Sequence, residues 1–225
     1  MNQSIQKNIL NISKKINQAA VRAGRNPAEV TLLAVTKTVA ATAINQALKK
    51  GITHLGENRV TEARDKFPLL DQSKKITKHL IGHLQKNKAK KAVELFDVFQ
   101  ALDSSKLAKK LEQECLLKRK TLKVMIQLNL SQEKTKFGIF EKYLAGFINE
   151  MKNYPHLKLT GLMTIPPLVQ NPNNNRVYFK KLKTWADKYN LPQLSMGMSQ
   201  DYEIAVEEGA TIVRIGSSIF GDREI

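Results

Sequence analysis

Cysteine is nearly absent from this sequence, and long apolar runs are absent altogether. Cys115 is the only cysteine among 225 residues, which excludes an intrachain disulfide and favours a reducing compartment. No apolar run reaches the roughly 18 residues that a membrane-spanning helix needs. Residues 1–7 are polar and lack the apolar core of a signal peptide. We therefore expect a cytoplasmic protein that does not cross a membrane.

Acidic residues are scarce relative to basic ones: 20 Asp and Glu stand against 37 Lys and Arg, a net charge of +17. The sharpest basic cluster runs from Lys74 to Lys91 with no acidic residue in between. A basic surface attracts nucleic acid or anionic small molecules. However, no aromatic residue interleaves with this cluster, as a platform for stacking bases would require. We therefore favour a solvated face over nucleic-acid binding, and an anion site or a partner surface stays open.

Strand-like and helix-like segments alternate along the whole chain. Isoleucines and alanines recur every three or four residues over 5–23, which predicts a leading amphipathic helix. Eight strand-like runs follow, at 30–36, 54–55, 79–82, 97–102, 122–129, 157–163, 193–196 and 211–215. Seven helical segments separate them, at 40–50, 60–66, 87–95, 104–118, 140–153, 177–189 and 202–208. Eight such units without a linker predict an α/β fold, a single (β/α)8 TIM barrel over residues 1–225 with an extra N-terminal helix.

A lysine ends the first predicted strand. Residues 30–36 are apolar or β-branched throughout, which is typical of a strand buried on both faces, and Lys37 follows directly. Taken alone, this lysine has two interpretations. It is the first solvated residue after a strand, since most lysines are exposed. Otherwise it points into the mouth of the barrel, where such folds keep their chemistry.

Two turns rich in small residues follow the last two predicted strands, at 195–199 and 216–218. Glycine lets the backbone approach an anion, serine adds a hydroxyl donor, and a helix start adds amide donors. The loops after strands seven and eight are the usual phosphate site of a (β/α)8 barrel, so the sequence predicts one here. Arg214 lies near the end of the eighth strand, where it faces the mouth or forms a surface salt bridge with Glu207 or Glu208.

The first and eighth strands of a closed barrel are neighbours, which would bring Lys37 to the predicted phosphate site. A lysine amine in that position suits a ligand that carries both an aldehyde and a phosphate, joined to the lysine as a Schiff base. Pyridoxal 5′-phosphate (PLP) is the ligand that we expect.

Six motifs occur in the same order as in a known family and together cover nearly the whole chain. They are LLAVTKT at 32–38, GEN at 56–58, IGHLQKNK at 81–88, GLMTIP at 161–166, SMGMSQD at 195–201 and VRIGSSIFG at 213–221. On these motifs the chain resembles the pyridoxal phosphate homeostasis proteins, the YggS/PROSC-like family. The resemblance implies the barrel domain of alanine racemase, which is fold type III among PLP-binding proteins.

The resemblance also implies a cofactor site. Lys37 matches the lysine that forms the Schiff base, and Arg214 matches the arginine that faces the pyridine nitrogen. The phosphate-binding positions and the pocket-lining motifs add Ser199, Gly216, Ser217, Asn58 and Met163. Three residues depart from the family pattern: Arg59 replaces tyrosine, Lys78 replaces tryptophan and Ser217 replaces threonine. The first two put in question what the rim of the pocket recognises.

The implied role is intracellular PLP (vitamin B6) homeostasis, with the cofactor held and not efficiently turned over. Alanine racemase uses a second base, a tyrosine supplied by another domain, and these 225 residues leave no room for such a domain. Tyr202 is the best remaining acid or base in the chain. The alternatives are a PLP-dependent racemase-like enzyme and, with less support, a basic nucleic-acid-associated protein.

The expected partners follow from the same role. PLP-requiring apo-enzymes are candidate recipients of the cofactor, and the chain suits a monomer or a weak dimer. His79 and His83 stand four residues apart, but no third ligand is nearby in sequence, so we expect no metal site.

Overall fold

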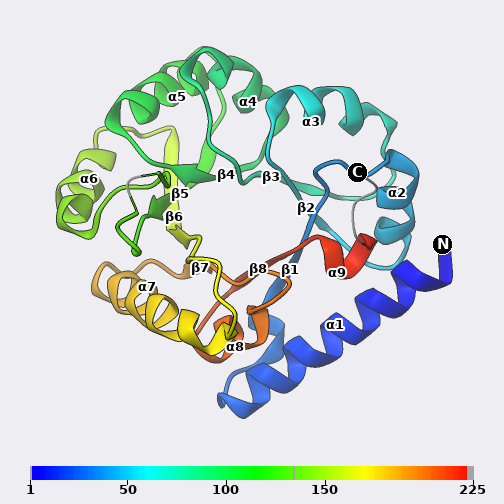
Figure 1. Cartoon of the computed structure of the whole chain (residues 1–225). Coiled ribbons are helices and arrows are strands. Elements are labelled where there is room, and N and C mark those ends of the chain that lie inside the picture. The colour runs from blue at the N-terminus through cyan, green and yellow to red at the C-terminus, as the bar shows by residue number, and fades with distance from the viewer. Residues whose placement is uncertain (1, 134, 222–225) are drawn as a thin grey trace.

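Eight parallel strands pair in chain order, and β8 returns to pair with β1, so the sheet closes into a barrel (Figure 1). This computed structural model describes residues 2–133 and 135–221. The strands are β1 (Thr31–Val35), β2 (His54–Glu57), β3 (Thr77–Leu80), β4 (Val98–Leu102), β5 (Leu122–Leu128), β6 (Leu157–Thr164), β7 (Gln193–Ser195) and β8 (Ile212–Ile215). The closed barrel confirms the predicted (β/α)8 fold.

Helices surround the barrel, and Figure 1 looks onto the end at which the strands terminate. The α-helices are α1 (Asn2–Arg22), α2 (Ala41–Lys49), α3 (Val60–Lys66), α4 (Ala89–Leu95), α5 (Ser105–Lys118), α6 (Leu144–Met151), α7 (Arg176–Lys188), α8 (Tyr202–Glu207) and α9 (Ser217–Phe220). Short 3-10 helices occupy Pro27–Glu29, Phe67–Leu69, Lys86–Lys88, Glu141–Tyr143 and Pro172–Asn175. Because every strand is covered by helices outside and by side chains inside, strands such as β4 are buried along their whole length.

Two predicted strand boundaries are wrong, and one short helix was not predicted. β3 begins at Thr77, two residues earlier than predicted, because the half-buried Thr77 and Lys78 interrupted the apolar run that marked the strand. β2 extends to Glu57, well beyond the predicted 54–55, and the charged end of that strand hid its length. The four-residue α9 after β8 was not predicted, since a single helical turn has no apolar period to detect.

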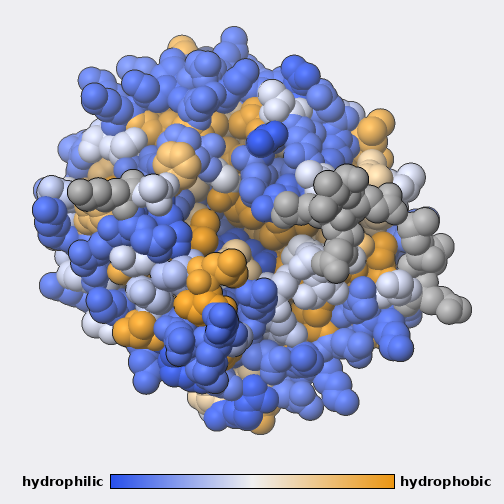
Figure 2. Space-filling view, in the orientation of Figure 1, coloured by the Kyte–Doolittle hydropathy of each residue, from blue (hydrophilic) through white to orange (hydrophobic). Residues whose placement is uncertain are grey.

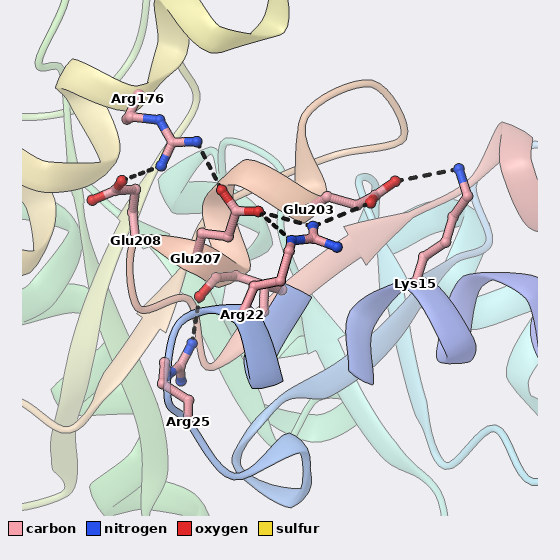
Figure 3. Close-up of polar contacts among 8 residues, drawn as sticks. Lys15, Arg22, Arg25, Arg176, Glu203, Glu207 and Glu208 are labelled. Carbon is pink, nitrogen blue, oxygen red and sulfur yellow. Dashed lines mark hydrogen bonds and ion pairs between the residues drawn. The ribbon is translucent and has the colours of Figure 1, made fainter. Parts of the chain in front are cut away.

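The leading helix α1 packs on α8 and α9 at the side of the barrel (Figure 1). Its buried stripe consists of Ile5, Ile9, Ile12, Ile16, Ala19 and Ala20. Figure 3 shows the ion pairs that join α1 and α7 to α8: Arg22 donates to Glu207 at 2.8 Å, Arg176 donates to Glu207 at 2.7 Å, and Lys15 approaches Glu203 at 3.2 Å. Because α8 directly follows the loop that contains Ser199, this network also fixes one side of the predicted phosphate site.

The face on which the strands terminate is mostly hydrophilic, with hydrophobic residues exposed around its hollowed centre (Figure 2). The loops that follow β5, β6 and β7 place four large apolar side chains at the surface, namely Phe137, Ile165, Leu168 and Met198. Within residues 2–133 and 135–221, no helix is both long enough and apolar enough to span a membrane.

Candidate functional site at the mouth of the barrel

Lys37 follows the end of β1 and is half-buried. Side chains alternate along a strand, so Lys37 continues the side of β1 that contains Leu33 and Val35. Leu33 pairs with Arg214 of β8, and a Cβ built on Gly216 would lie 3.5 Å from Cβ of Val35. Lys37 is two residues beyond Val35 on this side of the chain, and it therefore lies close to the start of the loop after β8. The closure of the barrel had predicted this neighbourhood.

A buried ion-pair cluster lies behind the Lys37 turn, and the sequence analysis missed it. Lys66 donates three hydrogen bonds through Nζ: to the Thr36 carbonyl at 2.7 Å, to Glu57 Oε1 at 2.9 Å and to Glu62 Oε1 at 2.7 Å. The Thr36 hydroxyl also donates to Glu57 Oε1 at 2.7 Å. Glu57 is fully buried, and this burial raises its pKa against the opposing hydrogen bonds from Lys66 and Thr36. We call these four residues the Lys66 clamp.

The clamp also holds a strained residue. Thr38, directly after Lys37, has a φ of 63°, a left-handed conformation that β-branched residues rarely adopt. Its amide donates to Glu62 Oε1, the carboxylate oxygen that also accepts from Lys66. Burial alone would raise the pKa of Glu62, but the bonds from Lys66 and the Thr38 amide outweigh it and lower the pKa. Hydrogen bonds on both sides of Lys37 thus fix its backbone in one conformation.

Arg214 lies inside the barrel and is 4% exposed. Its Nη1 donates to the Ser195 hydroxyl at 2.6 Å, and its Nη2 donates to the Thr164 carbonyl at 2.8 Å. Burial lowers its pKa to about 10, opposed by the charge of Asp201, so the guanidinium stays protonated at neutral pH. The surface salt bridge considered from the sequence is wrong, because Glu207 and Glu208 pair with other arginines (Figure 3).

The loops after β7 and β8 meet at their serines. The Ser217 hydroxyl donates to the Ser199 hydroxyl at 3.3 Å, so two predicted phosphate-binding residues are neighbours. Gly216 precedes the first turn of α9, and the first amides of a helix point out of its start without partners in the helix. Gly197 has a φ of 89°, and a Cβ on it would come within 2.5 Å of Ala205 on α8. The glycine therefore lets the first loop fold back tightly onto α8.

Asn58 and Met163 are both placed towards the barrel interior. Met163 is fully buried and pairs with Ser195, whose side chain reaches Arg214. Asn58 is half-buried and follows β2 on the side that His54 and Gly56 share. A Cβ on Gly82 would come within 2.3 Å of the Asn58 carbonyl oxygen, so the loop after β3 can approach Asn58 this closely only with glycine at position 82. Neither residue has contacts that assign it a direct role.

Tyr202 does not have the surroundings of a base. It begins α8 and is 6% exposed. It borders a groove of about 660 Å³ that is lined by α1 and α8 and also by Ser199 and Ser218 of the loops after β7 and β8. Burial, with the charge of Glu203 beside it, raises the pKa of Tyr202 to about 12. A phenol with this pKa is almost entirely protonated at neutral pH. Tyr202 is therefore poorly suited to accept a proton.

His79 is a further interior residue to which the sequence assigned no role. It is 2% exposed, and burial, with the nearby His54 and Lys123, lowers its pKa to about 3. His83 lies instead in the loop after β3, where it bonds Asp103 at 2.9 Å and stacks on Phe137. Among the described residues, no group of three or more His, Cys, Asp or Glu side chains could hold a metal ion.

The lowered pKa of His79 predicts acid sensitivity. The ordinary pKa of histidine is 6.5. Below this pH, His79 is protonated in the unfolded chain but stays neutral in the folded protein, so the free energy of unfolding should fall as the pH drops towards 3. One such proton corresponds to about 1.4 kcal/mol per pH unit. Urea unfolding of the wild type and of His79→Gln across this range measures the difference in slope. Equal slopes in the two proteins would contradict the lowered pKa.

Fold and site together define a class of protein. The chain is a (β/α)8 barrel with a lysine just beyond its first strand, a buried arginine on its last strand, and serine-bearing loops after the final two strands. The family model for the alanine racemase N-terminal domain matches residues 5–224. The chain belongs to this family and, within it, to the pyridoxal phosphate homeostasis proteins.

Three curated relatives support the narrower assignment, and each is named pyridoxal phosphate homeostasis protein. The relative from Aquifex aeolicus is 38% identical over 95% of this chain and 96% of its own length. The relative from Haemophilus influenzae is 38% identical over 98% of this chain and 96% of its own. The relative from Escherichia coli K12 is 37% identical over 96% of each chain.

Solved structures share the barrel. PipY of Synechococcus elongatus with PLP bound superimposes with a TM-score of 0.81 at 34% identity, covering 93% of this chain and 100% of its own. PipY without PLP gives a TM-score of 0.83 at 35% identity with the same coverage. An alanine racemase from Clostridium difficile has a TM-score of 0.71 at 13% identity, over 99% of this chain and 58% of that one. This last likeness concerns the fold alone.

Proposed function

We propose that this chain binds PLP through Lys37 and serves PLP homeostasis, holding the cofactor without efficient substrate turnover. The observation that supports the proposal is the pairing of β1 with β8, which brings Val35, two residues before Lys37, next to Gly216, together with the hydrogen bond between Ser217 and Ser199. The names of the relatives and the PLP-bound structure of PipY support the choice of cofactor.

The chemistry of the donor set fits this cofactor. An amine suits an aldehyde, a buried guanidinium suits a ring nitrogen with a lone pair, and a pair of hydroxyls beside a helix start suits a phosphate. The hydrogen-bond partners of Arg214 in the described part of the chain are neutral oxygens. Its buried charge is therefore balanced only at a distance, by Asp201, which favours an electron-rich ligand atom next to it.

Each residue then has a defined task. When bound, PLP supplies an aldehyde that bonds covalently to an amine and a ring that withdraws electrons. Lys37 provides that amine and the clamp keeps it in place, while Ser199, Gly216 and Ser217 bind the phosphate. Asn58 and Met163 line the pocket. Arg214 donates to the ring nitrogen but gives up no proton at neutral pH, so it leaves that nitrogen unprotonated.

The absence of turnover follows from the second proton that racemisation requires. Lys37 can move a proton on one face of a bound amino acid, and a second group must act on the other face. Tyr202, the best candidate in the sequence, is buried with a pKa of about 12, so it is almost entirely protonated at neutral pH. The alternative, a racemase-like enzyme, draws on the fold shared with alanine racemase.

Incubation of the PLP-loaded protein with L-alanine and, separately, D-alanine decides between these two functions. We expect no racemisation above the background given by free PLP, measured by chiral chromatography. Racemisation that is well above this background and is lost in Lys37→Ala would contradict the proposed role and establish the racemase-like alternative.

The cellular setting belongs to the same proposal. We place the protein in the cytoplasm, where PLP-requiring apo-enzymes are the candidate recipients of the cofactor. A protein that holds a reactive aldehyde on one lysine limits its reaction with other amines, and reversal of the bond lets the cofactor leave.

A further inference from the structure

A continuous line of polar side chains crosses the barrel interior beneath Arg214. Arg214 Nη1 bonds Ser195 Oγ at 2.6 Å, and Ser195 Oγ bonds Gln100 Oε1 at 2.6 Å. Gln100 Nε2 bonds His79 Nδ1 at 2.9 Å, and His79 Nε2 bonds His54 Nδ1 at 2.9 Å. The five residues come from five different strands, β8, β7, β4, β3 and β2. We call them the interior line.

The direction of every bond in the line is fixed from one end. The guanidinium of Arg214 can only donate, so the Ser195 hydroxyl accepts from it and donates its own hydrogen to the Gln100 carbonyl oxygen. The Gln100 amide group then donates to His79 Nδ1, which leaves the ring hydrogen of His79 on Nε2. That hydrogen is donated to His54 Nδ1, so the ring hydrogen of His54 is also on Nε2.

The interior line is buried and contains a single charged residue. Ser195 and Gln100 are fully buried, and His79 and Arg214 are 2% and 4% exposed. Burial lowers the pKa of His79 and of His54, and the charge of Lys123 lowers both further, so both rings are neutral at neutral pH. Arg214 is then the sole charge in the line, and each neutral member has one orientation that satisfies its neighbours.

We propose that Gln100 and His79 are positioning residues that fix the orientation of the Arg214 guanidinium towards the bound cofactor. This inference rests on the proposed function, because the group that Arg214 meets is the pyridine nitrogen of PLP. Gln100 holds the Ser195 hydroxyl so that its lone pairs face Arg214, and His79 holds the Gln100 amide so that its oxygen faces Ser195. A rotation of the Gln100 amide would turn a donor towards the Ser195 hydroxyl, and a rotation of the His79 ring would remove the acceptor of the Gln100 amide, so the hydroxyl would no longer be held as the acceptor for Arg214.

Gln100→Glu is the sharpest test, because it nearly preserves shape and reverses one bond. A carboxylate only accepts hydrogen bonds, so His79 must carry its hydrogen on Nδ1 in order to bond it. The substitution also places a negative charge at residue 100, which only the Ser195 hydroxyl separates from Arg214. Histidine ¹⁵N NMR of the protein without cofactor should show His79 as the Nε2–H form in the wild type and the Nδ1–H form in the variant. With ¹⁵N-labelled PLP bound, the ring-nitrogen resonance should move towards its value in water.

Two further variants keep the test decisive. Gln100→Met removes the amide, and we expect the dissociation constant of PLP to rise about tenfold while the bond to Lys37 still forms. His79→Gln is the second variant should Gln100→Met not fold. His156→Gln is the matched control, because His156 bonds Glu112 at 2.6 Å, outside the line, and should change neither the resonance nor the affinity.

The outcomes are separable. A folded Gln100→Glu protein that binds PLP through Lys37 with an unchanged ring-nitrogen resonance contradicts the positioning role and leaves the proposed function intact. A purely structural role for the line would give that result together with a loss of stability. A wild type that binds no PLP contradicts the proposed function and this inference with it.

Discussion

Replacement of Lys37 by alanine should abolish the covalent complex with PLP and weaken PLP binding by a factor on the order of 100. The loss is large because the covalent bond has no substitute in the pocket, whereas the phosphate contacts proposed for Ser199, Gly216 and Ser217 would remain. The absorbance band of the lysine adduct should disappear, and any residual binding should leave the spectrum of free PLP. Spectroscopic titration of the wild type and the variant measures both effects.

Lys37→Arg is the matched control for charge. Arginine keeps a cation at the end of β1 but forms no stable Schiff base, so the band should vanish while part of the affinity remains. If Lys37→Arg or Lys37→Ala kept the adduct band at full intensity, another lysine would be the anchor and the assignment of Lys37 would be wrong.

Lys66→Met should lower the free energy of unfolding by about 3–5 kcal/mol, because it leaves the Glu57 carboxylate buried without a cation. Lys66 is 11% exposed and Glu57 is fully buried, so solvent screens this pair little. Loss of the bond to the Thr36 carbonyl also frees the Lys37 turn, and PLP affinity should fall as well. Urea unfolding and PLP titration of the same preparation measure the two effects.

The double variant Lys66→Met/Glu57→Gln separates a stranded charge from lost packing. Once Glu57 is neutral, the methionine no longer leaves an ion unpaired, and at least half of the lost stability should return. PLP affinity should stay low, because the Thr36 carbonyl still has no donor from residue 66. A double variant no more stable than Lys66→Met would contradict the ion-pair explanation.

The barrel and the outline of the site were predictable because they depend on local signals. Each buried parallel strand is a short apolar run, and eight such runs alternating with amphipathic segments leave few other folds. Closure of the sheet then placed Lys37 beside the loop after β8 without any knowledge of distances. The serine-rich turns were recognisable because their residue types are unusual for strands and helices.

The clamp and the interior line were not predictable in the same way. Glu57 lay beyond the predicted strand at 54–55, within the GEN motif, whereas in the structure it ends β2 and pairs with Lys66. The four-residue spacing of Glu62 and Lys66 was the one local signal. The interior line draws one polar residue from each of five strands, and Gln100 and Ser195 are separated by 95 positions in the sequence. No spacing within the sequence marks such a set.

Residue types alone also left Arg214 undecided. Its position near the end of a strand suited either a surface salt bridge or the barrel mouth. In the structure, the two glutamates already pair with other arginines. Glu207 pairs with both Arg22 and Arg176, and Glu208 pairs with Arg176 (Figure 3). Arg214 instead bonds neutral oxygens inside the barrel, where an electron-rich ligand atom can stabilise it.

The most direct test of the central claim is borohydride reduction of the wild type incubated with stoichiometric PLP, followed by proteolysis and mass spectrometry. The chain contains 29 lysines, so unspecific labelling would be spread over many sites. We predict close to one reduced adduct per chain, located on Lys37. Adducts distributed over surface lysines, or a protein in which Lys37 stays unmodified, would contradict the account.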